Sequence, residues 1–166
     1  IMCGISGYIG KKNISSKAIN STILIMKNRG PDYQDYWTKR FEDVKVLLIH
    51  SRLSIIDLYE RSNQPMLFKN HILVFNGEIY NYVELKKALL SYGFKFTTES
   101  DTEVLLKSYI YWSDKFLMKI KGMFSFVIYD LEKNLLFCAR DHFGQKPFYY
   151  YHKNDNFIFS SELRSL

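Results

Sequence analysis

The spacing of apolar residues along the chain distinguishes predicted strands from predicted helices. Stretches in which apolar residues alternate with others, or follow one another without a break, predict strands. Residues 3–9 alternate apolar and small side chains, and residues 44–50 form a near-continuous apolar run, so both are expected to be buried strands. Residues 53–58 are interpreted as another strand, and residues 71–75 as a strand that halts at the turn-forming pair Asn76-Gly77. The second half of the chain adds four strand-like segments, at residues 123–129, 135–140, 147–151 and 157–160.

Three other segments have the apolar spacing of helices. The first follows Ser15 or Ser16, either of which could cap it, and runs to about residue 27. The second covers residues 83–90, and the third follows Ser100, which we expect to act as the N-cap with Glu103 as its capping-box partner. Because strands come in groups without regular strand–helix alternation, the pattern predicts an α+β fold of largely antiparallel sheets with helices packed on them.

Length and composition are those of one globular domain. The chain has 166 residues, of which 47% are hydrophobic, 24% charged and 17% aromatic, which argues against disorder. No apolar stretch reaches the length of a membrane span, and we expect no signal peptide. A helical pattern starts at residues 161–166 and stops after one or two turns, so we expect the chain to be the first domain of a longer protein.

Charge and cysteine content argue against nucleic-acid-binding, disulfide-rich and metal-binding classes of protein. The 23 basic and 17 acidic side chains give a net charge of +6, but the lysines are scattered singly or in pairs, which disfavours a nucleic-acid surface. Cys3 and Cys138 cannot form a disulfide framework, and neither they nor the four histidines have metal-ligand spacing. We therefore expect a cytoplasmic protein with no metal site, in which Cys138 is structural.

Cys3, near the start of the chain, is the candidate nucleophile. A buried cysteine usually serves as a small hydrophobic residue, but a cysteine at a chain terminus has a further chemical option. Its own α-amine, with a pKa of about 7.7–8.0, can take the thiol proton at neutral pH without a histidine. Gly4 would let a substrate approach the backbone closely.

Five other residues could support such a nucleophile. Asn76-Gly77 offers a side-chain amide and a backbone N–H, the kind of pair that stabilises a tetrahedral oxyanion. Arg52 offers a bidentate fork for a carboxylate, and Glu78 and Asp101 could hold a substrate ammonium. Taken singly, each also fits an ordinary role: a hairpin turn for the Asn-Gly pair, a surface ion pair for Arg52, and a helix-dipole contact for Asp101.

Eight segments, taken in their order along the chain, resemble a known family. Each short motif is weak evidence by itself, whereas the whole set in one order is specific. The segments are Met2-Cys3-Gly4-Ile5-Ser6-Gly7, Arg29-Gly30-Pro31-Asp32, His50-Ser51-Arg52-Leu53-Ser54-Ile55-Ile56-Asp57, Gln64-Pro65-Met66, Asn76-Gly77-Glu78-Ile79-Tyr80-Asn81, Ser100-Asp101-Thr102-Glu103, Gly122-Met123-Phe124-Ser125-Phe126 and Arg140-Asp141-His142-Phe143-Gly144-Gln145-Lys146-Pro147-Phe148-Tyr149-Tyr150. Over residues 1–166 the chain resembles the glutaminase domain of glutamine-hydrolysing asparagine synthetases, which are class II glutamine amidotransferases of the N-terminal-nucleophile type.

The resemblance implies both a fold and a chemistry. The family's fold is a four-layer αββα sandwich, in which two antiparallel sheets lie between helices. Cys3 would attack the side-chain amide of glutamine, with its α-amine acting as base and then as acid for the departing ammonia. Asn76 and the Gly77 N–H would form the oxyanion hole, and water would hydrolyse the γ-glutamyl thioester to glutamate.

The same resemblance implies the substrate contacts and the partners. Arg52 would clamp the α-carboxylate of glutamine, with the backbone of Leu53 and Ile55 nearby, and Glu78 and Asp101 would hold the α-ammonium. Ammonia would pass to a C-terminal synthetase domain in the same chain that amidates aspartate. We expect ATP and Mg²⁺ in that second domain and no cofactor in this one, and a homodimer is left open.

Two departures from the family pattern matter. Ile1 and Met2 precede Cys3. While both remain, the amine is tied up in a peptide bond, so we expect little glutaminase activity until they are removed. Asn28 stands where relatives often carry histidine, and we expect at most a structural change from it.

Two alternative functions also stay open. An amidotransferase of the same branch would amidate another carboxylate, such as a sugar acid in polysaccharide biosynthesis, because acceptor choice lies in the second domain. A catalytically silent binding module would keep the fold while Cys3 stays blocked. Residues 140–150 resemble the segment near the interface of the two domains, and His142 and the aromatic run 148–151 could be exposed there.

Overall fold

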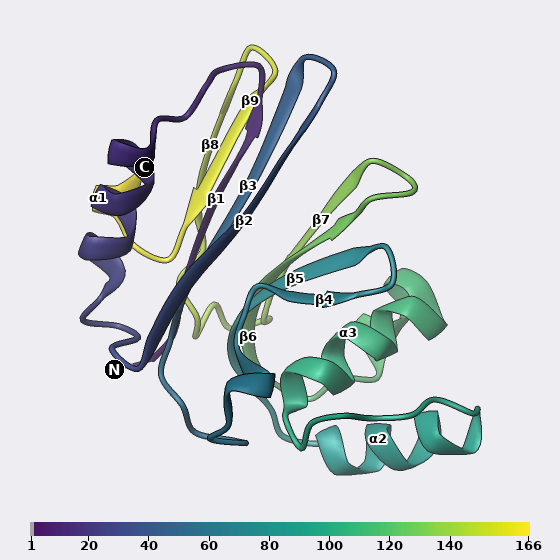
Figure 1. Ribbon diagram of the computed structural model, residues 1–166. Coiled ribbons are helices and arrows are strands. Elements are labelled where there is room, and N and C mark those ends of the chain that lie inside the picture. Colours follow the sequence, from purple (N-terminus) through teal and green to yellow (C-terminus); the bar gives the residue numbers. More distant parts are fainter. Residues whose placement is uncertain (1) are drawn as a thin grey trace.

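The computed structural model describes residues 2–166, so Ile1, one of the two residues that precede Cys3, lies outside the described residues. Two antiparallel sheets form the centre of the fold (Figure 1). The first sheet has the strand order β2-β3-β1-β9-β8, with β1 (Gly4–Gly10), β2 (Tyr33–Phe41), β3 (Val44–Arg52), β8 (Tyr149–Lys153) and β9 (Asn156–Ser160). The second sheet has the order β4-β5-β6-β7, with β4 (Met66–Phe68), β5 (His71–Ile79), β6 (Gly122–Asp130) and β7 (Leu135–Arg140).

Helices cover the outer face of each sheet (Figure 1). Helix α1 (Ser16–Met26) packs on the first sheet, and α2 (Tyr82–Ser91) and α3 (Asp101–Trp112) pack on the second. Short 3₁₀ helices cover Glu60–Ser62, Ser113–Met118 and Leu163–Ser165. The predicted α+β class and the αββα layering are therefore both confirmed, with every strand pair antiparallel.

Strand β3 shows why a continuous apolar run can be a strand. Val46 and Leu48 belong to the apolar cluster between the two sheets, whereas Leu47 and Ile49 face α1 on the outside of the first sheet. Successive side chains of a strand point to opposite faces, so a strand that is covered on both faces needs apolar residues at every position. This burial fixes the strand whose end carries Arg52.

Residues 53–58 form a loop, so the strand predicted there is wrong. Their backbone groups bind elsewhere: the Leu53 N–H donates to Cys3 Sγ at 3.3 Å, and the Ser54 N–H donates to the Asp32 carboxylate at 2.7 Å. Asp57 has φ +53°, a left-handed conformation that ends any extended run. The apolar spacing of this segment therefore reflects contacts at a pocket and not a sheet.

Strand β5 does not halt at Asn76-Gly77, which corrects the predicted turn. It continues to Ile79, with Asn76 opposite Ser125 of β6 and Gly77 opposite Phe124. A Cβ at Gly77 would lie 2.2 Å from the Met123 carbonyl oxygen, so glycine is needed here for close approach of the two strands. The Asn-Gly pair therefore lies inside a sheet that holds it rigidly.

The N-caps predicted for α1 and α3 are confirmed, but the capping box is not. Ser15 Oγ accepts from the Ala18 N–H, and Ser100 Oγ accepts from the Thr102 N–H, both at 3.2 Å. Glu103 does not reach back to Ser100, because its carboxylate accepts from the Thr97 and Thr98 N–H groups and from Lys107. A neighbouring cation thus draws Glu103 away from the cap.

Strands β2 and β4 were not predicted from the sequence. β2 lies at an edge of the first sheet, and all of its residues are half-buried or exposed. β4 has three residues and lies at the edge of the second sheet. Edge strands bury little side-chain area, so neither has the apolar alternation that identifies a strand.

Candidate active site

Cys3 lies directly before β1 and is held by the loop that follows β3. Its Sγ accepts from the Leu53 N–H at 3.3 Å and donates to the Leu53 carbonyl oxygen at 3.5 Å. Burial raises the pKa of the Cys3 thiol, which the Leu53 N–H and the charge of Arg52 only partly offset. The thiol is therefore protonated at neutral pH and needs a base before it can attack a substrate.

Arg29 anchors the main chain of Cys3 from the turn after α1. Its Nε donates to the Cys3 carbonyl oxygen at 3.1 Å, and its Nη1 forms an ion pair with Glu162 at 2.9 Å. Asp32, in the same turn, binds the Ser54 N–H beside Leu53. From the sequence this turn is recognisable only as a motif; in the structure it binds the main chain of Cys3 and of Ser54, next to the Leu53 that contacts the thiol.

One pocket brings together most of the predicted site residues. The space among its lining atoms is about 430 Å³, part of it open to solvent. Residues that are far apart in the sequence meet there, because the start of β1, the ends of β3 and β5 and the start of α3 lie together around the pocket. Seven of the eight predicted residues line it: Cys3, Arg52, Leu53, Ile55, Gly77, Glu78 and Asp101.

Asn76, the eighth predicted residue, lies next to Gly77 but does not line the pocket. It is fully buried, and among residues 2–166 neither its carboxamide nitrogen nor its carboxamide oxygen has a hydrogen-bond partner. Leaving such a group unpaired costs about 1–3 kcal/mol, so it is a feature that needs an explanation. An amide N–H without a partner among residues 2–166 is the kind of donor that can hold an oxyanion, and the assignment of Asn76 to an oxyanion hole stays a prediction.

Two residues that were not assigned from the sequence bind the main chain of Phe75, the residue before Asn76 in β5. His50 Nε2 donates to the Phe75 carbonyl oxygen at 3.0 Å, and burial lowers the pKa of His50 to about 3, so the ring stays neutral. Gln64 Oε1 accepts from the Phe75 N–H at 2.7 Å. Both residues belong to the recognised motifs, which was the one signal that could have indicated them.

Arg52 is buried and is already bound on one side. Its Nη1 donates to the Tyr59 carbonyl oxygen at 3.0 Å and to Asn63 Oδ1 at 2.7 Å, and its Nη2 donates to the Asp57 carbonyl oxygen. Among residues 2–166 these bonds use three of the five guanidinium N–H groups. The remaining Nε and Nη2 donors leave a fork for a carboxylate, and the alternative of a surface ion pair does not fit this burial.

Two carboxylates, Glu78 and Asp101, lie in the same pocket. The pKa of Asp101 is raised to about 6: burial is the main cause, hydrogen bonds from the Ile79 and Thr102 N–H groups oppose the rise, and the nearby charge of Glu78 adds to it. The Ile79 N–H donates to Asp101 Oδ2 at 2.9 Å, which ties the start of α3 to the end of β5. Two carboxylates that repel each other would both be stabilised by a cation between them.

Segment 140–151 lies beside the N-terminal side of Cys3 and is partly exposed. The Asp141 carboxylate accepts from the N–H groups of Phe124, Phe143, Gln145 and Lys146, which organises the loop. Lys146 is buried with its Nζ against Met2 Sδ, and burial lowers its pKa. His142 and residues 149–151 are exposed as expected, whereas Phe148 is half-buried and stacks on Phe159.

Neither a metal cluster nor a membrane helix is found in the described part of the chain. The His, Cys, Asp and Glu side chains of residues 2–166 form no group of three or more that could hold a metal ion. Over the same residues, every helix is too short or too polar to cross a bilayer. Cys138 lies in β7, where burial raises the pKa of its thiol to about 12, so it is not a reactive thiol at neutral pH.

Sequence comparisons place relatives along the whole chain. A family model described as a glutamine amidotransferase domain matches residues 2–166. The chain is 39% identical over 182 residues to a putative glutamine-hydrolyzing asparagine synthetase of Methanocaldococcus jannaschii, and 40% identical over 172 residues to a glutamine-hydrolyzing asparagine synthetase of Bacillus subtilis. Both alignments cover 99% of this chain but only 35% and 26% of those relatives, so the chain spans about a third of their length or less.

Solved structures show the same fold at lower identity. A glutamine phosphoribosylpyrophosphate amidotransferase from B. subtilis, complexed with ADP and GMP, superposes with a TM-score of 0.80 at 22% identity. The match covers 98% of this chain and 42% of that one. A structure titled as the allosteric regulatory enzyme of purine biosynthesis gives a TM-score of 0.78 at 20% identity, and at these identities the likeness concerns the fold alone.

Proposed function

The chain belongs to the glutamine amidotransferase domain family, and from this premise we propose that it hydrolyses the side-chain amide of glutamine to glutamate and ammonia. The observation that carries the proposal is the single pocket lined by the Cys3 thiol, the Arg52 guanidinium and the Glu78 and Asp101 carboxylates. These groups match the reacting amide, the α-carboxylate and the α-ammonium of one glutamine molecule. Each charged group of glutamine would then have an oppositely charged partner in the pocket.

The first half of the reaction would acylate Cys3. Once Cys3 is the first residue, its α-amine takes the thiol proton, and Sγ attacks the amide carbon of glutamine. The oxyanion that forms would accept from the Asn76 carboxamide and from the Gly77 N–H. The tetrahedral intermediate then expels ammonia as the C–N bond breaks, with the proton returned by the α-ammonium, and a γ-glutamyl thioester remains.

The second half would regenerate the enzyme. The α-amine takes a proton from water, which attacks the thioester carbon, and the same oxyanion donors stabilise the second tetrahedral intermediate. The C–S bond breaks, glutamate leaves, and the Cys3 thiolate recovers the proton. Because burial raises the pKa of the Cys3 thiol, the thiolate that leaves is reprotonated, and Cys3 rests as a thiol between turnovers.

We further propose that the ammonia passes to an ATP-dependent synthetase domain that amidates aspartate. The support is that the aligned relatives are named glutamine-hydrolyzing asparagine synthetases and are about three to four times longer than the matched part. The exposed side chains of His142 and residues 149–151 would face that domain. The proposal places ATP and Mg²⁺ in the second domain and assigns neither to residues 2–166.

The test is glutamate release by the full-length protein with and without a free Cys3 amine. We expect turnover from the protein that begins at Cys3 and little from the protein that keeps Ile1 and Met2. Cys3→Ala, with the same free terminus, is the matched control and should be inactive. Equal rates with the amine free and blocked would overturn the mechanism, and activity in Cys3→Ala would exclude Cys3 as the nucleophile.

A further inference from the structure

Asp57 lies in the loop between β3 and the 3₁₀ helix Glu60–Ser62, with features that its motif alone did not explain. Its side chain is fully excluded from solvent, although its loop is on the surface. Its φ of +53° is in the left-handed region, which is uncommon for a residue other than glycine. A buried carboxylate on an uncommon backbone conformation calls for partners on both its main chain and its side chain.

The main chain of Asp57 holds Arg52. The Asp57 carbonyl oxygen accepts from Arg52 Nη2, and two further groups of the same loop, the Tyr59 carbonyl oxygen and Asn63 Oδ1, accept from Nη1. All three bonds lie on one side of the guanidinium. The loop therefore sets the direction in which the free fork of Arg52 points.

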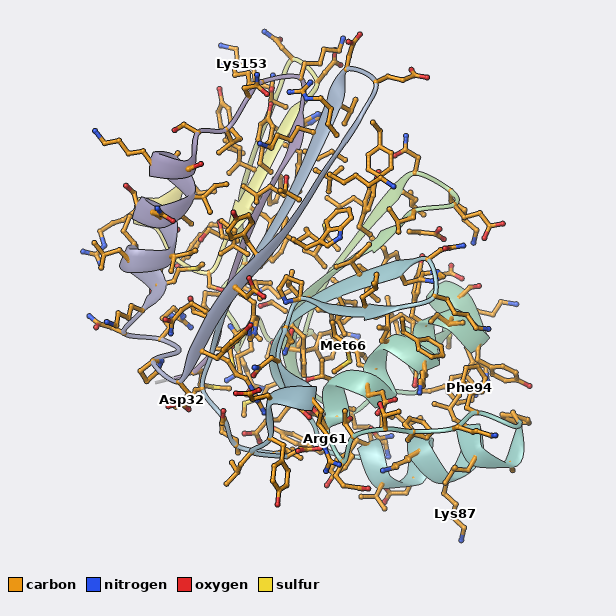
Figure 2. The ribbon with its side chains drawn as sticks, in the orientation of Figure 1. Asp32, Arg61, Met66, Lys87, Phe94 and Lys153 are labelled. Carbon is orange, nitrogen blue, oxygen red and sulfur yellow. The ribbon has the colours of Figure 1, made fainter. Side chains whose placement is uncertain are left out.

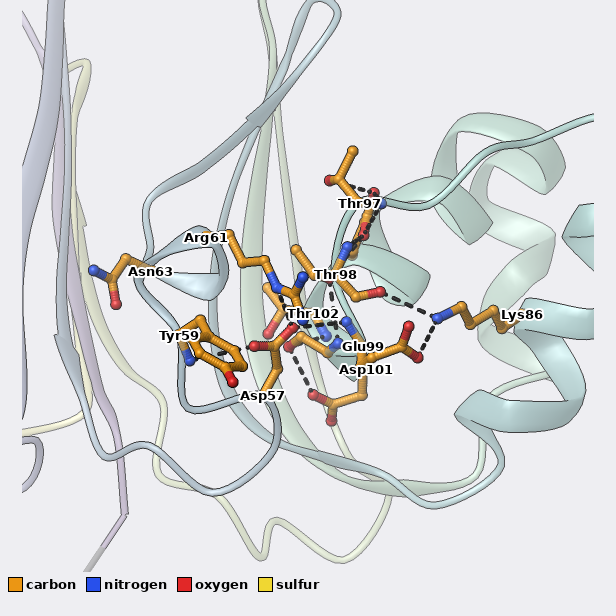
Figure 3. Close-up of polar contacts among 12 residues, drawn as sticks. Asp57, Tyr59, Arg61, Asn63, Lys86, Thr97, Thr98, Glu99, Asp101 and Thr102 are labelled. Atoms are coloured by element: carbon orange, nitrogen blue, oxygen red, sulfur yellow. Dashed lines mark hydrogen bonds and ion pairs between the residues drawn. The ribbon is translucent and has the colours of Figure 1, made fainter.

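The side chain of Asp57 holds the segment that leads into α3 (Figure 3). Its Oδ2 accepts from the Glu99 N–H at 2.7 Å and from Arg61 Nε at 2.9 Å. Burial alone raises the pKa of the Asp57 carboxyl, and the hydrogen bonds from Glu99 and Arg61 outweigh it, so the pKa lies below its ordinary value. The Asp57 side chain is therefore ionised at neutral pH. It binds the N–H of Glu99, which lies two residues before Asp101.

One neighbouring hydrogen bond also links the loop region to α3, and it is weaker. Gln64 Nε2 donates to Thr102 Oγ1 at 3.4 Å, near the limit of hydrogen bonding. The bond from the Glu99 N–H to Asp57 is short and charge-assisted, which makes it the stronger of the two. Asp57 is thus the firmer tie between the two walls of the pocket.

We infer that Asp57 is a positioning residue that sets the separation between Arg52 and Asp101, and thereby the selectivity for a free α-amino acid as substrate. The inference rests on the proposed function, in which these two side chains bind the α-carboxylate and the α-ammonium of glutamine. Those two substrate groups are a fixed distance apart, so both are bound well only while their partners keep the matching distance. Asp57 does not line the pocket, so it acts through Arg52 and Glu99 and not by touching the substrate.

Asp57→Gly separates the two roles, because glycine adopts the left-handed conformation and keeps the carbonyl that binds Arg52. It removes only the carboxylate, and with it the bond from the Glu99 N–H and the local bonds from Arg61 Nε and the Tyr59 N–H. In the full-length protein beginning at Cys3, we expect KM for glutamine to rise about tenfold, the size of losing one charge-assisted hydrogen bond, with kcat within about threefold. The preference for glutamine over glutaramic acid, which lacks the α-ammonium, should fall by about the same factor.

Asp57→Asn is the conservative variant. Asparagine also adopts the left-handed conformation, and its Oδ1 can still accept from the Glu99 N–H, so it should restore KM to within about threefold of the parent. A residue that served stability alone would change the folded fraction and not the ratio between the two substrates. A raised KM in Asp57→Gly together with a restored KM in Asp57→Asn would show that the hydrogen bond from the Glu99 N–H is what matters.

Asp155→Gly is the matched control. Asp155 has φ +58° and its carboxylate pairs with Lys11 at 3.2 Å, but it is exposed in the β8–β9 turn. Lys153, just before this turn, lies at the opposite end of the first sheet from Asp32, which is at the pocket end (Figure 2). The same change of residue type there should leave KM and the substrate preference unaltered.

Hydrogen exchange followed by mass spectrometry gives a readout that does not depend on catalysis. The peptide containing Glu99 should exchange about tenfold faster in Asp57→Gly and not in Asp155→Gly. Unchanged exchange, or a parent that hydrolyses glutamine while Asp57→Gly keeps KM within twofold, would overturn the inference. Absence of turnover in the parent would instead overturn the proposed function, while the exchange measurement would still show whether the tie exists.

Discussion

Gly77→Ala tests whether the β5–β6 pairing positions the oxyanion site. The added Cβ would lie 2.2 Å from the Met123 carbonyl oxygen and 2.7 Å from Phe124 Cα. Both are backbone atoms of β6 and cannot swing aside as a side chain does. Because unbonded atoms need more than about 3 Å, the strands would have to separate locally by roughly 1 Å.

Gly77→Ala should affect both the catalytic activity and the stability of the protein. A displacement of about 1 Å in a catalytic group lowers turnover about 100-fold, and loss of one oxyanion donor has an effect of similar or larger size. We therefore expect kcat for glutamine hydrolysis to fall at least about 100-fold. Overpacking should also lower the free energy of unfolding by about 1–3 kcal/mol, which leaves a folded protein to assay.

The assay is glutamate release per folded molecule, with unfolding in urea measured on the same samples. Gly93→Ala is the control, because Gly93 lies after α2 with φ +86° and nothing within 4 Å of its added Cβ. That change strains the backbone by about 1 kcal/mol and should lower stability without altering kcat. If folded Gly77→Ala kept kcat within threefold of the parent, the role assigned to this strand pairing would be wrong.

Two further predictions concern buried charges in α3. The pKa of Asp101 is about 6 in the fold against 3.8 for the free side chain, so the folded state binds its proton more tightly and stability falls as pH rises from about 4 to 6. Asp101→Asn should therefore weaken glutamine binding yet raise the free energy of unfolding at pH 8 by up to about 3 kcal/mol, with no gain at pH 4; an equal gain at both pH values would contradict this. Lys107→Met leaves the buried Glu103 carboxylate without its cation, so urea unfolding should show a loss of about 3–5 kcal/mol, and a loss under 1 kcal/mol would refute the pairing.

Local patterns predicted the elements that have a continuous apolar run or the apolar spacing of a helix. The strands β3 and β7 and the helices α1 to α3 are of this kind, and Ser15 and Ser100 cap helices where the spacing placed them. Prediction failed where a segment binds through its backbone to distant groups. The loop after Arg52 is the main case, since its N–H groups bind Cys3 and Asp32 and its apolar side chains only imitate a strand.

The chemistry of the site was also readable in the sequence, residue by residue. Cys3, Arg52 and Asp101 are side chains of the right type in a recognisable order, and the structure places all three in one pocket. Their catalytic and binding roles stay predictions until the assays above are made. The residues that support them, such as His50 and Gln64, had no signal beyond membership in a motif.

What the sequence by itself determined is the identity and order of the reactive groups and the periodic burial that folds them into two sheets with outer helices. What only the tertiary structure decided is the distances: the thiol against Leu53, the free carboxamide of Asn76, and the bond that joins Asp57 to Glu99. The physical reason is that each of these contacts joins residues that only packing brings together. The missing hydrogen-bond partner of the Asn76 carboxamide likewise depends on which residues pack around it. Hydrogen bonds between segments tens of residues apart leave no periodic trace in either segment.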